Sequence, residues 1–213
     1  AELLNLINNK VLTISENPIQ AYVKFKGDIG KIEYSPKDKT KPETTYEYDK
    51  LSFVVLDDTI GTITGFKKDP ISSNKIKMYD QESSLNVFLG KSPLASGKWS
   101  EIKEKVKNAG GNFTKLIYCY CLETGELVEI SVAKGKLLKW NQFLEKLSVK
   151  EGAGIGFKFT DIKEEVAGNT KYFDYNFMGR AATDEKVLAK AKELDTTLQN
   201  YLNTIINGKQ QQN

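Results

Sequence analysis

Between residues 19 and 90 the chain is a series of short segments in which apolar and polar residues alternate. Such alternation places every second side chain on the same face of a β-strand, so each segment has one buried and one solvated face. Glycine, proline, asparagine and paired aspartates separate the segments and are typical of turns. Residues 51–58 and 59–66 therefore predict two strands joined by a solvated turn at Asp57 and Asp58. We expect this half of the chain to form a mostly antiparallel sheet.

Three later segments change to the helical period. Apolar residues recur every three or four positions in residues 97–111 and 135–147, and both segments predict short amphipathic helices. Pairs of alternating, hairpin-like segments precede and follow the second of these helices. The last segment, residues 184–207, has a longer apolar stripe, acidic residues in its first turn and Thr183 as the predicted N-cap.

Together these patterns predict a mainly β protein with α decoration, of the α+β class. The number of strands suits an OB-like antiparallel barrel with short helices, closed by the long C-terminal helix. We divide the chain into a β-rich, single-stranded-nucleic-acid-binding domain at residues 1–180 and a C-terminal helix with a polar tail at residues 181–213. The apolar stripe of that helix needs a partner, which is either its own barrel or the same helix of another copy. A homo-oligomer formed through the helix is therefore one expectation.

The residue types argue against most catalytic chemistry. The chain has no histidine, which is the commonest general base and the commonest zinc ligand. Cys119 and Cys121 form a C-x-C pair that cannot complete a four-ligand zinc site, and no glycine-rich phosphate loop has the required spacing. We therefore expect no enzyme activity, no metal and no cofactor. A metal-dependent nuclease ranks third among the functions, because carboxylate-x-lysine pairs are frequent by chance in a lysine-rich chain.

Two strand-like segments carry Lys-x-Lys with an aromatic residue two positions away. In each strand the lysines and the aromatic residue share one face, and the opposite face is apolar. Lysines that attract phosphates and exposed rings that stack on unpaired bases are what a single-stranded nucleic-acid site requires. All but one of the 31 basic residues are lysine, which suits loose contact with phosphates better than base reading. The candidate binding residues are Tyr22, Lys24, Lys26, Lys75, Lys77 and Tyr79, with Lys67, Lys68 and Arg180 as further candidates for contact with the nucleic-acid backbone.

A resemblance adds to this interpretation. The runs FVVLDDTIGTITGF, SSNKIK, SGKWSEIKEKVKNAGGNFTKLIYCY and LLKWNQF together resemble the single-stranded DNA-binding proteins of tailed bacteriophages. The resemblance covers about residues 20–145, and its motifs are diffuse. It implies an OB-fold core that coats single-stranded DNA during phage replication and recombination, with replication or recombination proteins as partners. The final NGKQQQN has none of the acidic residues of the tail that this family implies.

An alternative function comes from another class. The chain would then be a phage structural or protein-interaction module whose exposed aromatic residues meet protein, since tyrosine also lines strands because of its high β-propensity. No apolar run approaches the roughly 20 residues that cross a bilayer, and the start AELLNLINN lacks the basic flank of a signal peptide. We therefore expect a cytoplasmic protein without a membrane partner, located in the host cytoplasm if it is phage-encoded.

Overall fold

The computed structural model describes residues 16–37, 45–78, 80, 82–146, 155–167, 170–181 and 184–207. The described strands are β1 (Ala21–Lys26), β2 (Lys31–Pro36), β3 (Tyr46–Tyr48), β4 (Ser52–Phe66), β5 (Pro70–Ser73), β6 (Ile76–Lys77), β7 (Leu85–Leu89), β8 (Ser92–Gly97), β9 (Gly111–Cys121), β10 (Leu127–Ala133), β11 (Ile155–Ala167) and β12 (Thr170–Ala181). The described helices are α2 (Trp99–Asn108), α3 (Lys134–Lys146) and α4 (Glu185–Asn207).

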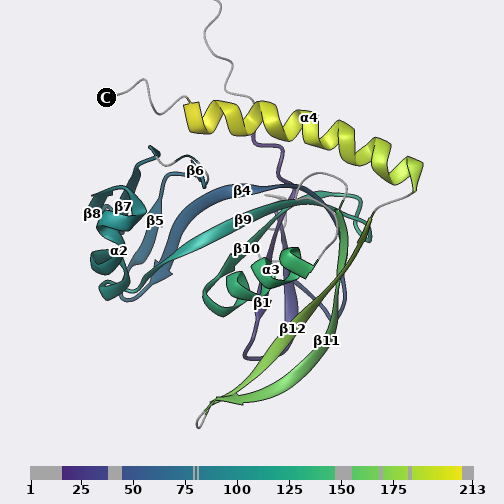
Figure 1. Ribbon diagram of the computed structural model, residues 1–213, viewed down its shortest axis with the longest axis horizontal. Coiled ribbons are helices and arrows are strands. Elements are labelled where there is room, and N and C mark those ends of the chain that lie inside the picture. The colour runs from purple at the N-terminus through teal and green to yellow at the C-terminus, as the bar shows by residue number, and fades with distance from the viewer. Residues whose placement is uncertain are drawn as a thin grey trace, which may run out of the picture.

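The twelve strands of the described residues belong to one sheet whose main order is β3-β2-β1-β10-β9-β4-β5-β7-β8. Neighbouring strands are antiparallel except β1 and β10, which are parallel. Strand β6 and the β11–β12 hairpin also pair with β4, and the hairpin extends away from the body of the molecule (Figure 1). The α+β class is confirmed. The pairings of the described strands form an open sheet and show no closed barrel.

Strand β4 is the spine of this sheet, because it pairs with β9 along one edge and with β11, β6 and β5 in turn along the other. The sequence predicted a turn at Asp57 and Asp58, and that prediction is wrong. Both aspartates lie within one continuous strand and are buried, at a point where the register against β9 shifts twice. Such irregularities bend a strand and re-aim its side chains.

The two aspartates point to opposite faces of the sheet, as expected for neighbours on a strand. Asp57 accepts hydrogen bonds from Thr59 and from Gln199 of α4. Asp58 lies 3.4 Å from Nζ of Lys115 and accepts a hydrogen bond from the indole N–H of Trp140 in α3. Burial of both carboxylates is therefore tolerated because distant partners satisfy them.

Three apolar cores hold the sheet to its helices. The first lies between β1, β2, β4, β9, β10 and α3, where it contains both free cysteines and Trp140. The second lies between the opposite face and α4, and its sheet residues are Val54, Leu56, Ile60, Leu116, Tyr118 and Leu127. We call this side of the sheet the α4 face. The third fills a smaller lobe made by β5, β7, β8 and α2, next to β6 in Figure 1.

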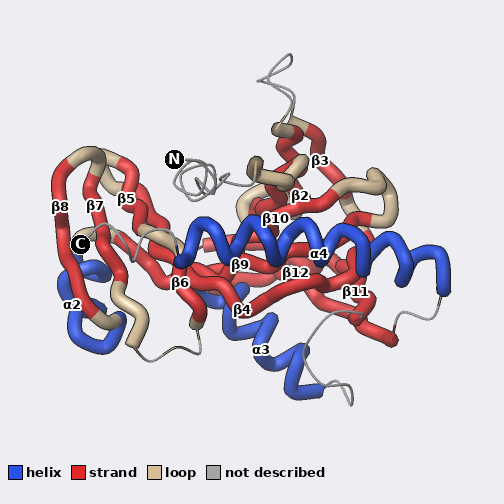
Figure 2. Tube along the Cα trace, turned by 90° about the horizontal axis from the view of Figure 1, so that it is seen from above, coloured by secondary structure: helices blue, strands red, loops and turns tan. Residues whose placement is uncertain are grey.

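Helix α4 covers the middle of the α4 face (Figure 2). Ala191, Leu198, Tyr201 and Leu202 are buried against the sheet, so the apolar stripe finds its partner within the same chain. The predicted N-cap Thr183 lies outside the described residues. Instead, the side chain of Asp184 accepts hydrogen bonds from the backbone N–H groups of two residues in the first turn, as an N-cap does. None of the described helices combines the length and apolar character that crossing a membrane would require.

Candidate nucleic-acid interface

The orientation predicted for the first Lys-x-Lys strand is confirmed. In β1, Ala21, Val23 and Phe25 are buried in the first core, which places Tyr22 and the two lysines on the opposite side. That opposite side is the α4 face, because Tyr22 packs against the second core. Strand alternation was sufficient to predict this, since each residue's face depends only on its neighbours.

The second Lys-x-Lys strand lies on the same face. In β6, Ile76 is buried in the third core, and Lys77 pairs directly with Ile60, a residue of the α4 face. Residues paired across antiparallel strands point to the same side, so Lys77 and Lys75 share a face with Tyr22. The fold thus brings together two segments that are about fifty residues apart in the sequence.

A row of paired residues connects the two segments. Across the sheet, Tyr22 is opposite Glu129, Glu129 is opposite Tyr118, and Tyr118 is opposite Asp57. Lys75 crosses this row, with its Nζ 3.0 Å from Glu129 Oε2 and 3.4 Å from Tyr118 Oη. The same ammonium group lies 5.9 Å from the centre of the Tyr118 ring, within cation–π distance.

Lys77 and Lys26 also have acidic neighbours. Nζ of Lys77 lies 3.8 Å from Asp57 Oδ2, which also accepts a hydrogen bond of 2.9 Å from Gln199. Nζ of Lys26 lies 3.3 Å from Glu33. A phosphate would therefore have to compete with a carboxylate for each of these lysines. Lys24, on the same face of β1, is exposed.

Tyr22 is half-buried, and burial is the main cause of its raised pKa, followed by the charge of Glu129. Burial also raises the pKa of Tyr118 and of Tyr201, which belongs to α4. To expose these rings, α4 would have to leave the sheet. The burial of Leu198 and Leu202 alone is worth about 1.5–3 kcal/mol each. One stacked base returns only about 1–3 kcal/mol, so it does not offset that loss.

The remaining predicted residues lie elsewhere. Lys67 and Lys68 are exposed in the turn between β4 and β5. Tyr79 lies outside the described residues. Arg180 is in β12, but the position of its side chain is not described. Of the nine candidates, Lys24, Lys67 and Lys68 are thus the exposed ones where the structure describes them.

Sequence reasoning missed two aromatic residues. Phe66 ends β4 with 73% of its surface exposed, and Phe88 in β7 is 39% exposed. The available signal was alternation, because Ile63 and Val87 face the third core and thereby turn Phe66 and Phe88 outward. Phe66 is opposite Pro70 in the ladder, and Phe88 is opposite Ser72, so both rings are on the same side of the sheet.

This side continues the α4 face. Along β4, Ile60, Thr62, Thr64 and Phe66 follow each other at intervals of two, and Ile60 already lies beneath α4. Helix α4 ends near β6, and β5, β7 and β8 lie beyond that end (Figure 2). We call this part, which α4 does not cover, the open platform. It consists of Thr64, Phe66, Ser72, Asn86 and Phe88, all of which are exposed.

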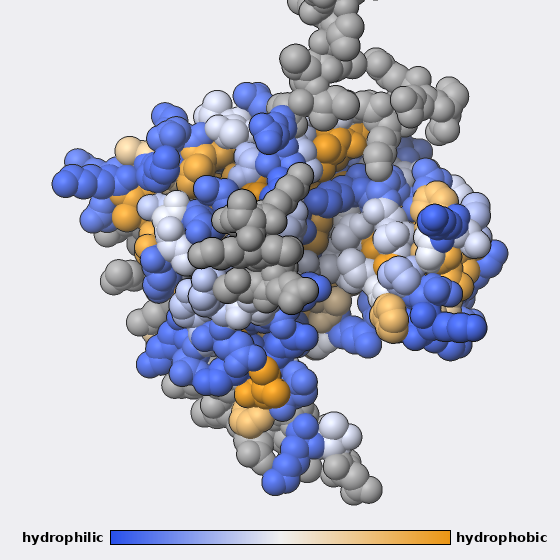
Figure 3. Space-filling view, turned by 180° about the vertical axis from the view of Figure 1, so that it is seen from behind, coloured by the Kyte–Doolittle hydropathy of each residue, from blue (hydrophilic) through white to orange (hydrophobic). Residues whose placement is uncertain are grey.

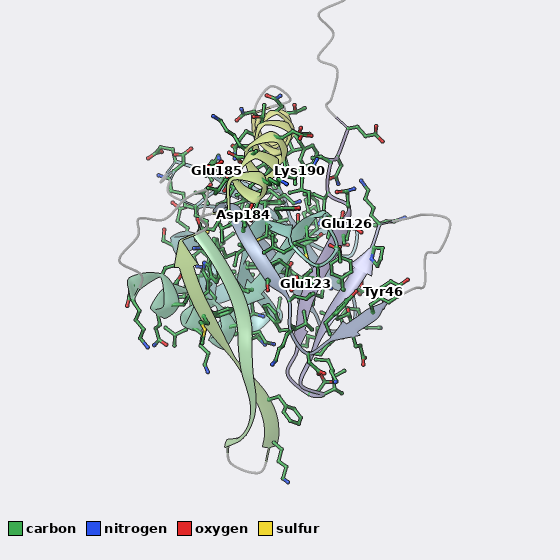
Figure 4. All side chains as sticks on the ribbon, turned by 90° about the vertical axis from the view of Figure 1, so that its right-hand side faces the viewer. Tyr46, Glu123, Glu126, Asp184, Glu185 and Lys190 are labelled. Carbon is green, nitrogen blue, oxygen red and sulfur yellow. The ribbon has the colours of Figure 1, made fainter. Side chains whose placement is uncertain are left out.

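Two acidic residues lie toward the β3 end of the sheet. Glu123 and Glu126 lie in the β9–β10 hairpin on the same side of the molecule as Tyr46 of β3 (Figure 4). Both carboxylates are engaged: Glu126 accepts a hydrogen bond of 2.9 Å from Tyr34 Oη, and Glu123 accepts from the backbone N–H of Ser52. At the other end, Lys67 and Lys68 lie beside the open platform.

The described residues hold no group of three or more cysteines and carboxylates arranged to bind a metal ion. The Lys115–Asp58 pair has the composition of a catalytic pair but is enclosed by the first core, where neither side chain is more than 4% exposed. Its geometry suits a structural role. Comparisons of the chain with protein-family models, with curated proteins and with solved structures give no match in any of the three.

Proposed function

We propose that this chain is a non-enzymatic protein that binds single-stranded DNA with little sequence preference. The observation that carries the proposal is the open platform, a strand-built surface with exposed aromatic rings and with exposed lysines in the adjoining turns. A phosphate backbone attracts lysines, and unpaired bases attract exposed rings. Duplex DNA offers the same phosphates but keeps its bases stacked, so the rings favour single strands.

The lysines of the proposed interface are those that solvent reaches. Among the described residues, no ion pair involves Lys24, Lys67, Lys68 or Lys91, and all four are exposed. Lys26, Lys75 and Lys77 contribute positive potential, although each lies beside a carboxylate. The OB-type core, the coating of DNA in phage replication and recombination, and a host-cytoplasm location follow from the resemblance and belong to the same proposal.

A protein-interaction module is the second candidate, and exposed apolar side chains away from the open platform favour it. Tyr46 on β3 is 47% exposed, and Leu138 on α3 is 59% exposed. Neither needs nucleic acid to explain it, because exposed rings and leucines also meet protein partners. Such a protein would bind DNA no more tightly than its modest charge of +3 allows.

Fluorescence anisotropy with a labelled oligo-dT of about 15 nucleotides tests the proposal, with the matching duplex as control. We expect tighter binding to the single strand. Four lysines that each neutralise one phosphate give a log–log salt slope of about −3, at about −0.7 per phosphate. Equal affinity for the duplex, or no binding at low salt, would overturn the proposal and leave the protein-interaction module as the better interpretation.

A further inference from the structure

We infer that Phe66 and Phe88 are the side chains on which DNA bases stack, and that the lysines of the two adjoining turns hold the neighbouring phosphates. This inference rests on the proposed function and assigns its contacts. It moves the stacking site from the two Lys-x-Lys strands to the open platform. The ligand class is a single-stranded polynucleotide with bases, not a phosphate chain alone.

The two turns next to the open platform lie side by side. Gly90, in the β7–β8 turn, donates a backbone hydrogen bond of 2.8 Å to the carbonyl of Pro70, where β5 begins. A side chain at Gly90 would come within 3.6 Å of Asp69, in the β4–β5 turn. Lys67 and Lys68 precede Asp69, and Lys91 follows Gly90. Three exposed lysines thus lie in two neighbouring turns at one end of the surface.

The five residues of the platform itself are uncharged. They are threonine, serine, asparagine and two phenylalanines, and Asp69 is the one carboxylate within the two adjoining turns. Figure 3 shows the lobe from behind, on the right of that view, with apolar patches separated by polar side chains. The two phenylalanines do not belong to the third core, because Ile63, Ile71 and Val87 occupy the other side of the strands.

The spacing of the two rings suits separate bases. Phe66 and Phe88 are two strands apart and offset by two residues, which separates their Cα atoms by about 12 Å. Rings stack on each other at about 4.5–7 Å between centroids, so these two leave each other's faces open. The rings therefore offer two distinct stacking surfaces along one strand of DNA.

The covered part of the same face cannot supply these contacts. Tyr22 is half-buried there, Tyr118 is fully buried, and Tyr201 belongs to α4 itself. Lys75, which links them, is already held by Glu129. Among the residues the structure describes, Phe66 and Phe88 are the exposed aromatic residues of the α4 face, whereas Tyr22 and Tyr120 are partly buried against the second core.

The test uses the full chain and two probes, an oligo-dT and an abasic oligomer of equal length with the same phosphates. Phe66→Ala and Phe88→Ala should each weaken oligo-dT binding by about five- to 150-fold, since a stacked base is worth that much in affinity. Binding of the abasic oligomer should stay unchanged. Phe66→Trp, which keeps a ring, should retain oligo-dT affinity.

Tyr46→Ala is the matched control, because Tyr46 is an exposed aromatic residue at the far end of the same sheet. It should leave both affinities unchanged. Oligo-dT binding that survives both phenylalanine substitutions, or weakens equally in Tyr46→Ala, overturns this inference while the proposed function stands. A wild-type protein that binds neither probe overturns both. Thermal melting of each variant distinguishes weaker binding by a folded protein from unfolding.

Discussion

The covered and open parts of the α4 face differ in what their aromatic and charged residues do. In the covered part, Tyr118 and Glu129 form hydrogen bonds and ion pairs with Lys75 beneath a helix. In the open platform, Phe66 and Phe88 face solvent with lysines in the adjoining turns. The same residue types thus stabilise the fold in one place and remain available to a ligand in the other. What separates them is the position of α4.

The largest effect is expected when the packing of α4 on the sheet is disturbed. Leu202→Ala should destabilise the protein by about 2–5 kcal/mol, because Leu202 is fully buried and its truncation leaves a cavity. Asn203→Ala, at the exposed neighbouring position, is the matched control and should change the free energy of unfolding by less than about 0.5 kcal/mol. Chemical denaturation measures both.

The result decides whether α4 is part of the core. If Leu202→Ala melts like the wild-type protein, the helix is a loosely held cover, and Tyr22 returns as a stacking candidate. If the variant is destabilised but binds oligo-dT normally while folded, the division into a covered and an open part stands.

Lys75 tests the covered part directly. Lys75→Ala should lower the free energy of unfolding by about 1–3 kcal/mol, because it leaves the nearly buried carboxylate of Glu129 without its cation. A double-mutant cycle with Glu129→Ala should show a coupling of roughly 0.5 kcal/mol or more. Affinity for oligo-dT should change little per folded molecule.

Lys24→Ala is the matched control for that prediction, since Lys24 is exposed on the same face. It should leave stability unchanged and weaken DNA binding at low salt. The reverse pattern, with Lys75→Ala impairing binding and leaving stability intact, would show that Lys75 contacts phosphate as the sequence pattern predicts.

Local alternation was enough to predict which side chains of β1 and β6 share a face, because side-chain direction in a strand depends on adjacent residues alone. It failed for Asp57 and Asp58, whose partners Gln199, Lys115 and Trp140 come from distant parts of the chain. Two adjacent aspartates in a sequence are typical of a turn, and the sequence does not show the partners that allow both to be buried. Burial of both was decided by tertiary contacts that no local pattern carries.

The candidate site shows the same limit. The sequence correctly grouped lysines and aromatic residues on one face of β1 and lysines on one face of β6. It had no means to place α4 over Tyr22, because the apolar stripe of the helix fits its own sheet or another copy equally well. Alternation placed Phe66 and Phe88 on the face opposite Ile63 and Val87, but only the structure shows that Ile63 and Val87 are on the core side.

High pH offers a third test, which acts mainly on the titratable side chains that the fold encloses. Burial raises the pKa of Cys119, from an ordinary value of 9.0, and that of Tyr118, from 10.0. In the folded state both groups keep their protons, whereas the unfolded chain releases them above those values. Stability should therefore fall as pH rises above about 9. Lys136, whose pKa burial lowers, works in the opposite direction and partly masks this loss.

Denaturation under reducing conditions at neutral and alkaline pH measures this loss. Tyr118→Phe should make the dependence on pH shallower, because it removes one of the titrating groups. The matched control is Tyr46→Phe, at an exposed position. An identical pH profile in wild type and Tyr118→Phe would mean that the Tyr118 hydroxyl is not as enclosed as the structure places it.

The smallest change in stability is expected for the lysines in the turn beside the open platform. Lys67→Ala combined with Lys68→Ala should change the free energy of unfolding by less than about 0.5 kcal/mol, because both side chains lie in an exposed turn. The same pair of substitutions should reduce the magnitude of the salt slope by about 1.4, at about 0.7 for each phosphate that is no longer neutralised.

The control is Lys186→Ala with Lys190→Ala, which removes equal charge from α4. It should leave the slope unchanged, since these lysines lie on the helix that covers the middle of the face. An equal drop in both double variants would mean that DNA responds to overall charge alone. A drop confined to Lys67 and Lys68 places the phosphates beside Phe66, where the covered part of the face ends.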